Sequence, residues 1–420
     1  MRVRDYRLFF SGQLLSQTGN FMQILAQAWL VLELSGSALD LGLVTAVQFL
    51  PLLLLSPTAG VLVDGIDRRR LLLITQTLGL LDAALLGLLA LTGTATVPVI
   101  FTLALFLGLV GAVESPARQV LVFDLVGSQL IGNAVSLNEV TINFARILGP
   151  AVGGILLTAW GPGPCFLVNA LTYLVALWVL LVIHPQPELD RAPHPAAGLV
   201  EGGRRRRMAG ALAAFLDGLR YVGGRPDLRG LLVLAGASAM IFNFGVALPV
   251  LAESGFRSGA RGYGLMVAAF GAGALVGAGV AAADRAPGAR RARVLALLTA
   301  LLLLASVAMP TLGWELVLQA VTGTVSIWFV AIANAGLLLL SSPPMRGRVM
   351  GLWSMSLPGS TPVTGVLVGW ITSVLGGRAG LAAVAVTLLL CVVLTWSGLG
   401  AQPPEPQRPA DRGSEDRRTS

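Results

Sequence analysis

The sequence contains no lysine, only two cysteines and two histidines, and charged residues make up only 12% of it. Cys165 and Cys391 lie far apart in apolar surroundings, which excludes a disulfide framework and a cysteine metal site. His184 and His194 lie at or beyond a predicted helix end, so no histidine cluster is available to hold a metal. The sequence also has no Ser/His/Asp arrangement and no nucleotide-binding glycine loop with its lysine. We therefore predict that the protein is not an enzyme and has no cofactor or metal.

The low charge is matched by an excess of apolar residues. Soluble globular proteins carry about 25% charged residues, whereas this chain of 420 residues is 55% hydrophobic and has a mean hydropathy of +0.79. Apolar stretches of about 20 residues recur along it, and each is long enough to cross the hydrocarbon core of a bilayer as a helix. The composition predicts an all-α polytopic membrane protein.

Twelve candidate spans are found, in two sets of six. The first set covers 8–33, 40–63, 71–92, 97–116, 134–158 and 164–184. The second set covers 229–252, 261–283, 293–311, 315–340, 349–373 and 379–399. We expect residues 1–184 and 229–399 to form two six-helix bundles, with 185–228 as a cytoplasmic linker and 400–420 as a disordered cytoplasmic tail. The N-terminus lacks a small-residue cleavage site, so the first span is expected to be retained rather than removed as a signal peptide.

The arginines are distributed asymmetrically between the predicted loops. With both termini in the cytoplasm, 25 of the 29 arginines lie in cytoplasmic segments and three lie in external loops, as the positive-inside rule predicts. The net charge of +8 therefore reflects topology, and we expect no nucleic-acid partner. In the linker, four arginines (Arg204–Arg207) precede apolar residues at helical spacing between Leu212 and Val222. This segment is either an amphipathic helix on the inner leaflet, in contact with membrane lipid, or a solvated linker.

The two halves of the chain resemble each other at three places. The stretch LGLVTAVQF at 41–49 is similar to YGLMVAAFG at 263–271, an offset of 222 residues. Asp64 and Asp284, 220 residues apart, each stand at a helix end before an arginine cluster. GPAVGG at 149–154 has a counterpart in TPVTG at 361–365. These repeats predict two six-helix bundles related by a pseudo-twofold axis along the membrane normal, an arrangement suited to alternating access.

The pattern G-x-x-x-D-x-x-x-R-R-R at residues 60–70 resembles the signature loop of the major facilitator superfamily. Other stretches are similar to one branch of it, the transmembrane secretion effectors, which include the enterobactin exporter and macrolide-efflux proteins. These stretches are RLFFSGQLLSQTGNFM (7–22), LVLELSGSALDLGLV (30–44), DRRRLL (67–72), ESPARQVLVFDLV (114–126), NAVSLNEVTINFARILGPAVGG (133–154) and MRGRVMGLW (345–353). The resemblance implies the major facilitator fold, with twelve transmembrane helices in two pseudo-symmetric bundles, in the plasma membrane of a bacterium.

The signature loop is the predicted cytoplasmic gating motif. An aspartate at the end of the second span interacts with the positive N-terminal dipole of a neighbouring helix, which is worth about 0.3–2 kcal/mol. The resemblance implies that this neighbour is the eleventh span, so the contact would hold the cytoplasmic side closed. The plainer interpretation is a short turn marked by arginines, and Gly65 stands where the family commonly has a basic residue. The motif residues of the two halves are Asp64, Arg68, Arg69 and Arg70, and then Asp284, Arg285, Arg290 and Arg291.

Ionisable residues inside the bilayer are costly and indicate function by default. In the fifth span, Glu139, Asn143 and Arg146 share one helix face. Glu139 either handles protons or substrate with Arg146 as its partner, or the polar group fixes this span to its neighbours. Asp82 in the third span and Glu114 at the cytoplasmic end of the fourth are the other coupling candidates, with a structural role as the alternative.

A glycine-rich stretch of the fifth span is expected to bend that helix and to let another helix approach closely. Its residues are Gly149, Pro150, Gly153 and Gly154. The stretch resembles the latter part of the antiporter signature of the superfamily, although the upstream glycines of that signature are missing here. The resemblance favours efflux over uptake.

Polar side chains on several spans are expected to line a roomy, mostly apolar cavity, because a polar stripe facing lipid would be costly. The candidates are Gln13, Gln17, Asn20, Gln27, Asn143, Asn243, Gln319, Thr322 and Ser326. Asn20 stands where relatives often carry an aspartate, so this chain must use another acid if that group handles protons.

Together these features predict a secondary active transporter that exports a small, partly apolar solute such as a drug, a macrolide or a siderophore-like molecule. Proton antiport by a monomer is the expected mechanism. An importer of the same fold, and a polytopic membrane enzyme or non-transporting membrane protein, are the alternatives.

Overall fold

The computed structural model describes residues 4–63, 67–183, 216–242, 244–284, 288–342 and 345–396, and nearly all of them are helical. The N-terminal half contains α1 (Arg4–Ser35), α2 (Ala38–Val63), α3 (Arg68–Leu91), α4 (Val97–Trp160) and α5 (Pro162–Val182). The C-terminal half contains α7 (Pro226–Phe242), α8 (Phe244–Val250), the π-helical turn η2 (Leu251–Gly255), α9 (Gly259–Ala283), α10 (Ala289–Val307), α11 (Leu312–Leu340), α12 (Arg346–Leu375) and α13 (Gly377–Thr395). Asp64, Arg285, Asn243, residues 185–215 and the tail 400–420 lie outside the described residues.

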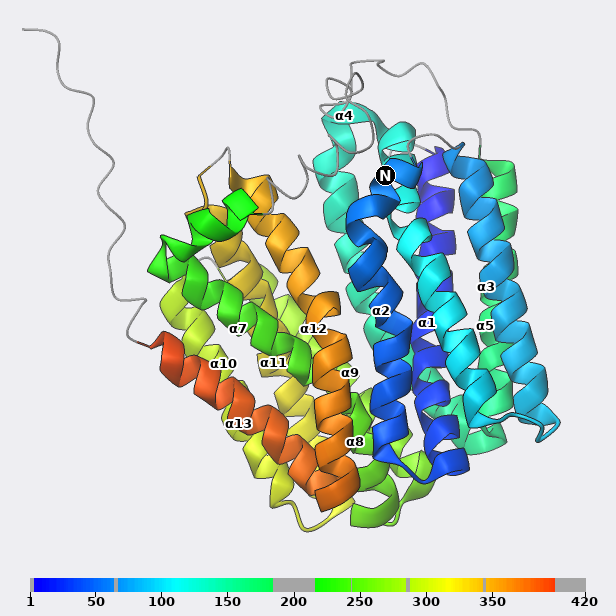
Figure 1. The fold of residues 1–420 in the computed structure, drawn as a ribbon, viewed down its shortest axis with the longest axis vertical. Helices are drawn as coiled ribbons and strands as arrows, with labels where there is room; N and C mark the ends of the chain where they lie inside the picture. The colour runs from blue at the N-terminus through cyan, green and yellow to red at the C-terminus, as the bar shows by residue number, and fades with distance from the viewer. Residues whose placement is uncertain are drawn as a thin grey trace, which may run out of the picture.

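Helix α4 accounts for two of the predicted spans. Its 64 residues would extend about 96 Å if straight, three times the thickness of a hydrocarbon core. Instead the helix turns back on itself (Figure 1). Gly108 of the first leg packs against the backbone of Gln48 in α2, and Gly149 of the second leg packs against the backbone of Thr18 in α1. Helix α4, which is continuous in its backbone hydrogen bonds, therefore crosses the bundle twice.

The described part of the chain has seven helices long and apolar enough to cross a membrane, and two shorter apolar helices at Phe144–Trp160 and Ser360–Leu375. The predicted all-α membrane fold is confirmed. With α4 counted as two legs, and α7, α8 and η2 counted as one crossing, the arrangement is consistent with six crossings in each half. Figure 1 shows the two halves as separate groups of helices, α1–α5 and α7–α13.

The two bundles approach most closely at one end, which we call the joined end. There α2 begins, the second leg of α4 ends and α9 begins. A Cβ on Gly42 would lie 2.3 Å from the carbonyl oxygen of Gly365, and one on Gly154 would lie 2.7 Å from the Cα of Gly264. Backbones can approach this closely only where both helices lack a side chain. The helix pairs α2–α12 and α4–α9 thus join the bundles, and the helices diverge toward the opposite end (Figure 1).

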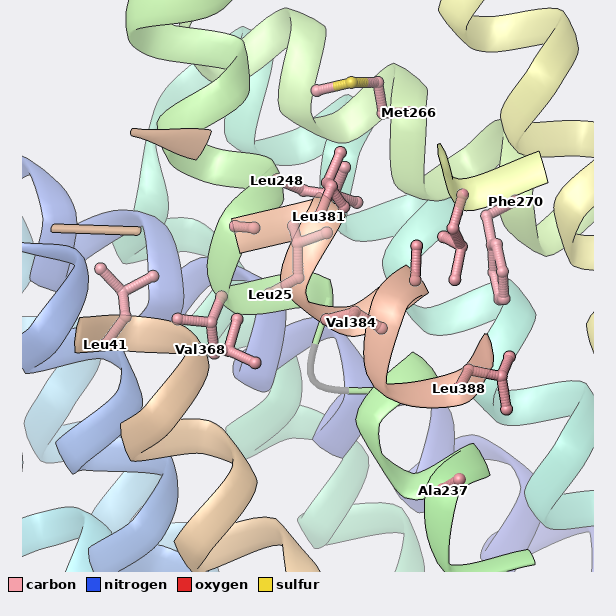
Figure 2. Packing of buried hydrophobic residues seen from close by; sticks show 14 of the residues in the cluster. Leu25, Leu41, Ala237, Leu248, Met266, Phe270, Val368, Leu381, Val384 and Leu388 are labelled. Carbon is pink, nitrogen blue, oxygen red and sulfur yellow. The ribbon is translucent and has the colours of Figure 1, made fainter. Parts of the chain in front are cut away.

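A shared hydrophobic core reinforces the joined end. The ring of Trp29 in α1 stacks on that of Tyr263 in α9, with centroids 6.1 Å apart. The main buried cluster contains residues of both halves. Figure 2 shows one part of it, in which Leu41 of α2 lies beside Val368 of α12.

The end of the predicted linker is helical from residue 216 to 223 and packs on the C-terminal bundle. The backbone N–H of Ser342 donates to the hydroxyl of Tyr221 at 3.1 Å, and Arg348 lies 3.4 Å from Asp217. Val222 is buried, whereas Leu216 and Leu219 are exposed. A helix with two exposed leucines suits a place at the membrane surface, which stays a prediction.

Candidate functional site

A cluster of buried polar side chains joins α1, α3 and α5 inside the N-terminal bundle. We call it the Asp82 cluster, and it consists of Asn20, Gln23, Asp82, Asn169 and Tyr173. Tyr173 donates to Asn20 at 2.8 Å, and Asn169 donates to Gln23 at 2.6 Å and to Asn20 at 3.3 Å. Gln23 in turn donates to Asp82 at 3.3 Å. Three helices thus share one hydrogen-bonded network within an apolar bundle.

Asp82 is the acid of this network and is incompletely satisfied. Its side chain is 3% exposed, Oδ2 accepts from Gln23, and Oδ1 has no hydrogen-bond partner among the described residues. A buried carboxylate without a cation is costly, so the neutral acid is favoured over the ionised form in such a site. The geometry therefore suits Asp82 to bind and release a proton.

A second acid, Glu114 of α4, contacts the same face of α3, closer to the opposite end. Gln76 donates to Glu114 of α4 at 3.0 Å, and Arg118 forms an ion pair with Glu114. Gln76, Gly79 and Asp82 are three residues apart in turn, and Gly79 packs directly against the ring of Tyr173. The two acids proposed from the sequence thus lie about two helical turns apart along one buried polar face, and Glu114 is held by a cation whereas Asp82 is not.

Sequence reasoning missed three members of the Asp82 cluster. Gln23 is three residues from Asn20 and four from Gln27, so helical spacing would have placed it on the same polar stripe. Asn169 is a lone amide in an apolar helix, and Tyr173 follows it by one turn. Gln13 and Gln27 are buried and Asn20 and Gln17 are half-buried, so the stripe on α1 faces the protein interior.

The described residues of the predicted gating motif, at the start of α3, make contacts within their own bundle. Asp67 caps α3 by accepting from the N–H groups of Arg69 and Arg70 at 2.9 and 3.1 Å. Arg69 donates to the carbonyl oxygens of Leu180 and Leu181 at 2.8 and 2.7 Å. A cation at these last carbonyls complements the negative end of the α5 dipole. The guanidinium of Arg70 lies 4.0 Å from Asp67, and Arg68 is half-buried.

In the equivalent motif of the second half, Asp284 contacts residues of its own bundle. Asp284, at the end of α9, forms an ion pair with Arg291 of α10 at 2.8 Å. It also accepts from the indole of Trp328 in α11 at 3.0 Å, and the Arg291 guanidinium lies 5.4 Å from the centre of that ring. The side chain of Asp284 is 3% exposed, whereas Arg290 is exposed. Three helices of the C-terminal bundle therefore meet at Asp284.

The glycine-rich stretch of α4 is the surface on which its second leg packs. Gly149 and Gly153 face α1, where a Cβ would lie 2.5 Å from the carbonyl oxygen of Thr18 and 2.9 Å from Cγ of Met22. Gly154 faces α9, as described above, and Pro150 is buried inside the helix. The guanidinium of Arg146 lies 5.5 Å from the centre of the Phe21 ring. Glu139 and Asn143 lie on this helix, but their side chains are outside the described part.

The polar residues proposed on α11 lie inside the C-terminal bundle. Gln319, Thr322 and Ser326 are at most 1% exposed, so none of them faces an open cavity in this conformation. Glu315, one turn before Gln319 on the same face, is fully buried and was missed from the sequence. Among the described residues, no group of three or more His, Cys, Asp or Glu side chains could hold a metal.

Comparison with known proteins identifies the family. The family model described as transmembrane secretion effector matches residues 1–401. The multidrug efflux pump Tap of Mycolicibacterium fortuitum is 28% identical over 400 residues, 92% of this chain and 94% of the relative. The staphyloferrin A transporter of Staphylococcus aureus is 35% identical over 179 residues, 42% of this chain and 45% of the relative.

The fold is shared with solved transporters. A bacterial homolog of the human lysosomal transporter Spinster, in an inward-facing and unoccupied conformation, superposes with a TM-score of 0.70. The match is 16% identical in sequence and covers 94% of this chain and 97% of that one. This chain is therefore a transporter of the transmembrane secretion effector family, within the major facilitator superfamily.

Proposed function

We propose that the protein is a secondary active exporter that moves a small, partly apolar solute out of the cell by alternating access, driven by proton influx. The observation that carries this proposal is Asp82, a buried carboxyl group with one oxygen that has no hydrogen-bond partner among the described residues. Asp82 lies in the N-terminal bundle, which makes its close contacts with the C-terminal bundle at the joined end. One feature supplies a proton site, and the other supplies an interface that can open.

Charge supports the orientation. Among the described arginines near helix ends, Arg257, Arg261 and Arg378 lie at the joined end. The larger set at the opposite end is Arg4, Arg7, Arg68, Arg69, Arg70, Arg220, Arg225, Arg229, Arg290, Arg291, Arg293, Arg346 and Arg348. By the positive-inside rule the opposite end faces the cytoplasm. We therefore interpret the structure as inward-open, with the joined end closed toward the outside.

Two described residues of the motifs, Arg69 and Asp284, fit this interpretation. In an inward-open transporter the contacts that close the cytoplasmic side are broken, so motif residues are expected to pair within their own halves. Arg69 and Asp284 do so. Contacts worth about 0.3–2 kcal/mol at a helix terminus can exchange partners as the bundles rock, and we propose that Asp64 and Asp284 form the cross-bundle contacts of the outward-open state.

The relatives support efflux as the direction and define the solutes to test. Tap is a multidrug efflux pump, and the other relative is a staphyloferrin A transporter. Partly buried aromatic and amide groups on α1, such as Phe21, Gln17 and Asn20, would contact a solute that is both apolar and polar.

The test is transport into inside-out membrane vesicles with an imposed pH gradient and a panel of macrolides, other drugs and siderophores. Accumulation of at least one solute that collapses on addition of an uncoupler is the expected result, relative to vesicles without the protein. Accumulation that survives the uncoupler would overturn proton antiport, and a panel without any accumulated solute would overturn efflux of these classes.

A further inference from the structure

The C-terminal bundle contains a buried carboxyl group that the proposed mechanism does not use. Glu315 lies one turn inside the start of α11, at the joined end, and its exposed fraction is 0%. Ser306 of α10 donates to Oε1 of Glu315, and Gln319 donates to the same oxygen at 2.7 Å. Oε2 is buried and has no hydrogen-bond partner among the described residues.

The side-chain amide of Gln319 also has a hydrogen bond at only one of its two polar atoms, the nitrogen. Oε1 of Gln319 is buried and has no donor within the described part of the chain. An ionised carboxyl accepts only, whereas a protonated one has an O–H donor as well as an accepting oxygen. A proton on Oε2 of Glu315 would therefore supply the donor that Gln319 lacks. The acid and the amide would then pair through two complementary hydrogen bonds.

The surroundings of Glu315 do not compensate a negative charge by contact. The charged groups near this end of the bundle are Glu253 of η2, Arg257 and Arg261 before and within α9, and Arg378 of α13, and all four are exposed. Of these, Arg378 interacts electrostatically with Glu315 without forming an ion pair with it among the described residues, and it donates to the carbonyl of Met309. The charged residues of α7, α10 and α12 lie at the opposite end. An isolated carboxylate in such a site is far more costly than the neutral acid.

We propose that Glu315 is a proton-binding site of the C-terminal bundle, occupied in this conformation and in exchange with the solution at the joined end when that end opens. The proton on Oε2 removes the charge from this buried site and supplies a donor for Oε1 of Gln319, while Ser306 of α10 donates to Oε1 of Glu315. The side chain of Leu312 in α11 lies against Gly262 of α9, two residues before the contact of Gly264 with Gly154 of the other bundle, so separation of α9 from α4 would open the start of α11 to water. Loss of the proton leaves a carboxylate that needs water, which favours that conformation. Acid outside the cell thus stabilises the conformation seen here.

This proposal rests on the proposed function only for the assignment of the joined end to the outside. It concerns a site in the other bundle from Asp82. Glu315 is also too close to the joined end to deliver its proton to the cytoplasm in this conformation. We therefore assign Glu315 a proton-sensing role, in which its protonation stabilises the conformation with the joined end closed. The transported proton is assigned to Asp82 of the N-terminal bundle.

The test measures conformation rather than transport. Spin labels at Thr94→Cys and Leu375→Cys, both at exposed positions of the joined end in different bundles, report the distance between the bundles from pH 5 to 9. We expect the wild type to shift from short to long distances as pH rises. Glu315→Gln, whose amide can make the same hydrogen bonds as the protonated acid, should keep the short distance at every pH. Glu253→Gln, an exposed glutamate at the same end, should behave as wild type.

Two results would overturn the proposal. One is a Glu315→Gln variant that shifts with pH as the wild type does. The other is an infrared difference spectrum in which the band of a protonated carboxyl is unchanged between wild type and Glu315→Gln at neutral pH. Neither readout involves a substrate or a gradient. Failure of the proposed efflux in vesicles would therefore leave the test of Glu315 unaffected, and the reverse also holds.

Discussion

The contact between Gly154 and Gly264 gives a sharp prediction about how the bundles move. A Cβ added to Gly154 would lie 2.7 Å from the Cα of Gly264, and one on Gly264 would lie 2.6 Å from the Cα of Gly154. Carbon atoms normally approach to about 3.5–4.0 Å, so Gly154→Ala requires α4 and α9 to separate by most of an ångström. The obstacle is backbone on both sides and has no rotamer into which it can retreat.

The expected magnitude follows from this geometry. Insertion of a methyl group into a tightly packed contact costs about 1–3 kcal/mol, and this cost falls on the joined conformation alone. The equilibrium should therefore shift by about 5–150-fold toward the conformation in which the joined end is open. Turnover should fall, because the return to the joined conformation becomes the unfavourable step.

Thiol labelling measures this shift directly. Val368→Cys places a thiol in the shared core beside Leu41, and its reaction with a membrane-impermeant maleimide reports opening of the joined end. Gly154→Ala should raise the labelling rate. Gly111→Ala on the same helix is the matched control, because a Cβ there meets no atom within 4 Å. If Gly154→Ala is labelled no faster than Gly111→Ala, then close packing at this site does not set the conformational equilibrium.

Three further substitutions test other parts of the account. Asp82→Asn should reduce gradient-driven transport in vesicles at least tenfold without loss of membrane insertion, because it removes the acid of the buried cluster. The half-buried Asp40→Asn is the control, and equal losses in the two variants would remove Asp82 as the coupling group. Arg69→Gln should lower the free energy of unfolding by about 1 kcal/mol, measured by thermal unfolding in detergent, because it removes two hydrogen bonds to the end of α5. The exposed Arg290→Gln should be neutral, and a neutral Arg69→Gln would contradict that role. Glu139→Gln should change the pH profile of transport, and an unchanged profile would exclude this residue from coupling.

Periodicity in the sequence predicted the fold well, because the bilayer leaves few alternatives. A stretch of about 20 apolar residues can be accommodated only as a helix whose backbone groups are satisfied internally. The predicted spans therefore overlap described helices, from the span 8–33 in α1 (Arg4–Ser35) to the span 379–399, whose described part lies mostly in α13 (Gly377–Thr395). The continuity of α4 between Arg118 and Glu139 was not predictable, since polar residues there indicate a loop as readily as a helix.

The site was predicted only in part, because spacing places a side chain on a helix face but does not tell which neighbour that face meets. Asp82 was found as an intramembrane acid, yet Gln23, which donates to it, lies 59 residues away in sequence, and Asn169, which donates to Gln23, lies 87 residues from Asp82. The polar face of α11 was recognised at Gln319, Thr322 and Ser326, and the structure places these residues inside the bundle. Glu315 was missed although it stands on the same face, because it lies at the very start of its helix.

The central claim is that the two bundles rock about a shared interface, so that one end closes as the other opens. Two distances measured on one protein test it most directly. Spin labels at Arg70→Cys and Arg348→Cys report the opposite end, and labels at Thr94→Cys and Leu375→Cys report the joined end; all four positions are exposed. When pH or a transported solute changes the distribution, we predict that one distance lengthens while the other shortens. Two distances that lengthen together, or one that changes while the other stays fixed, would contradict the account.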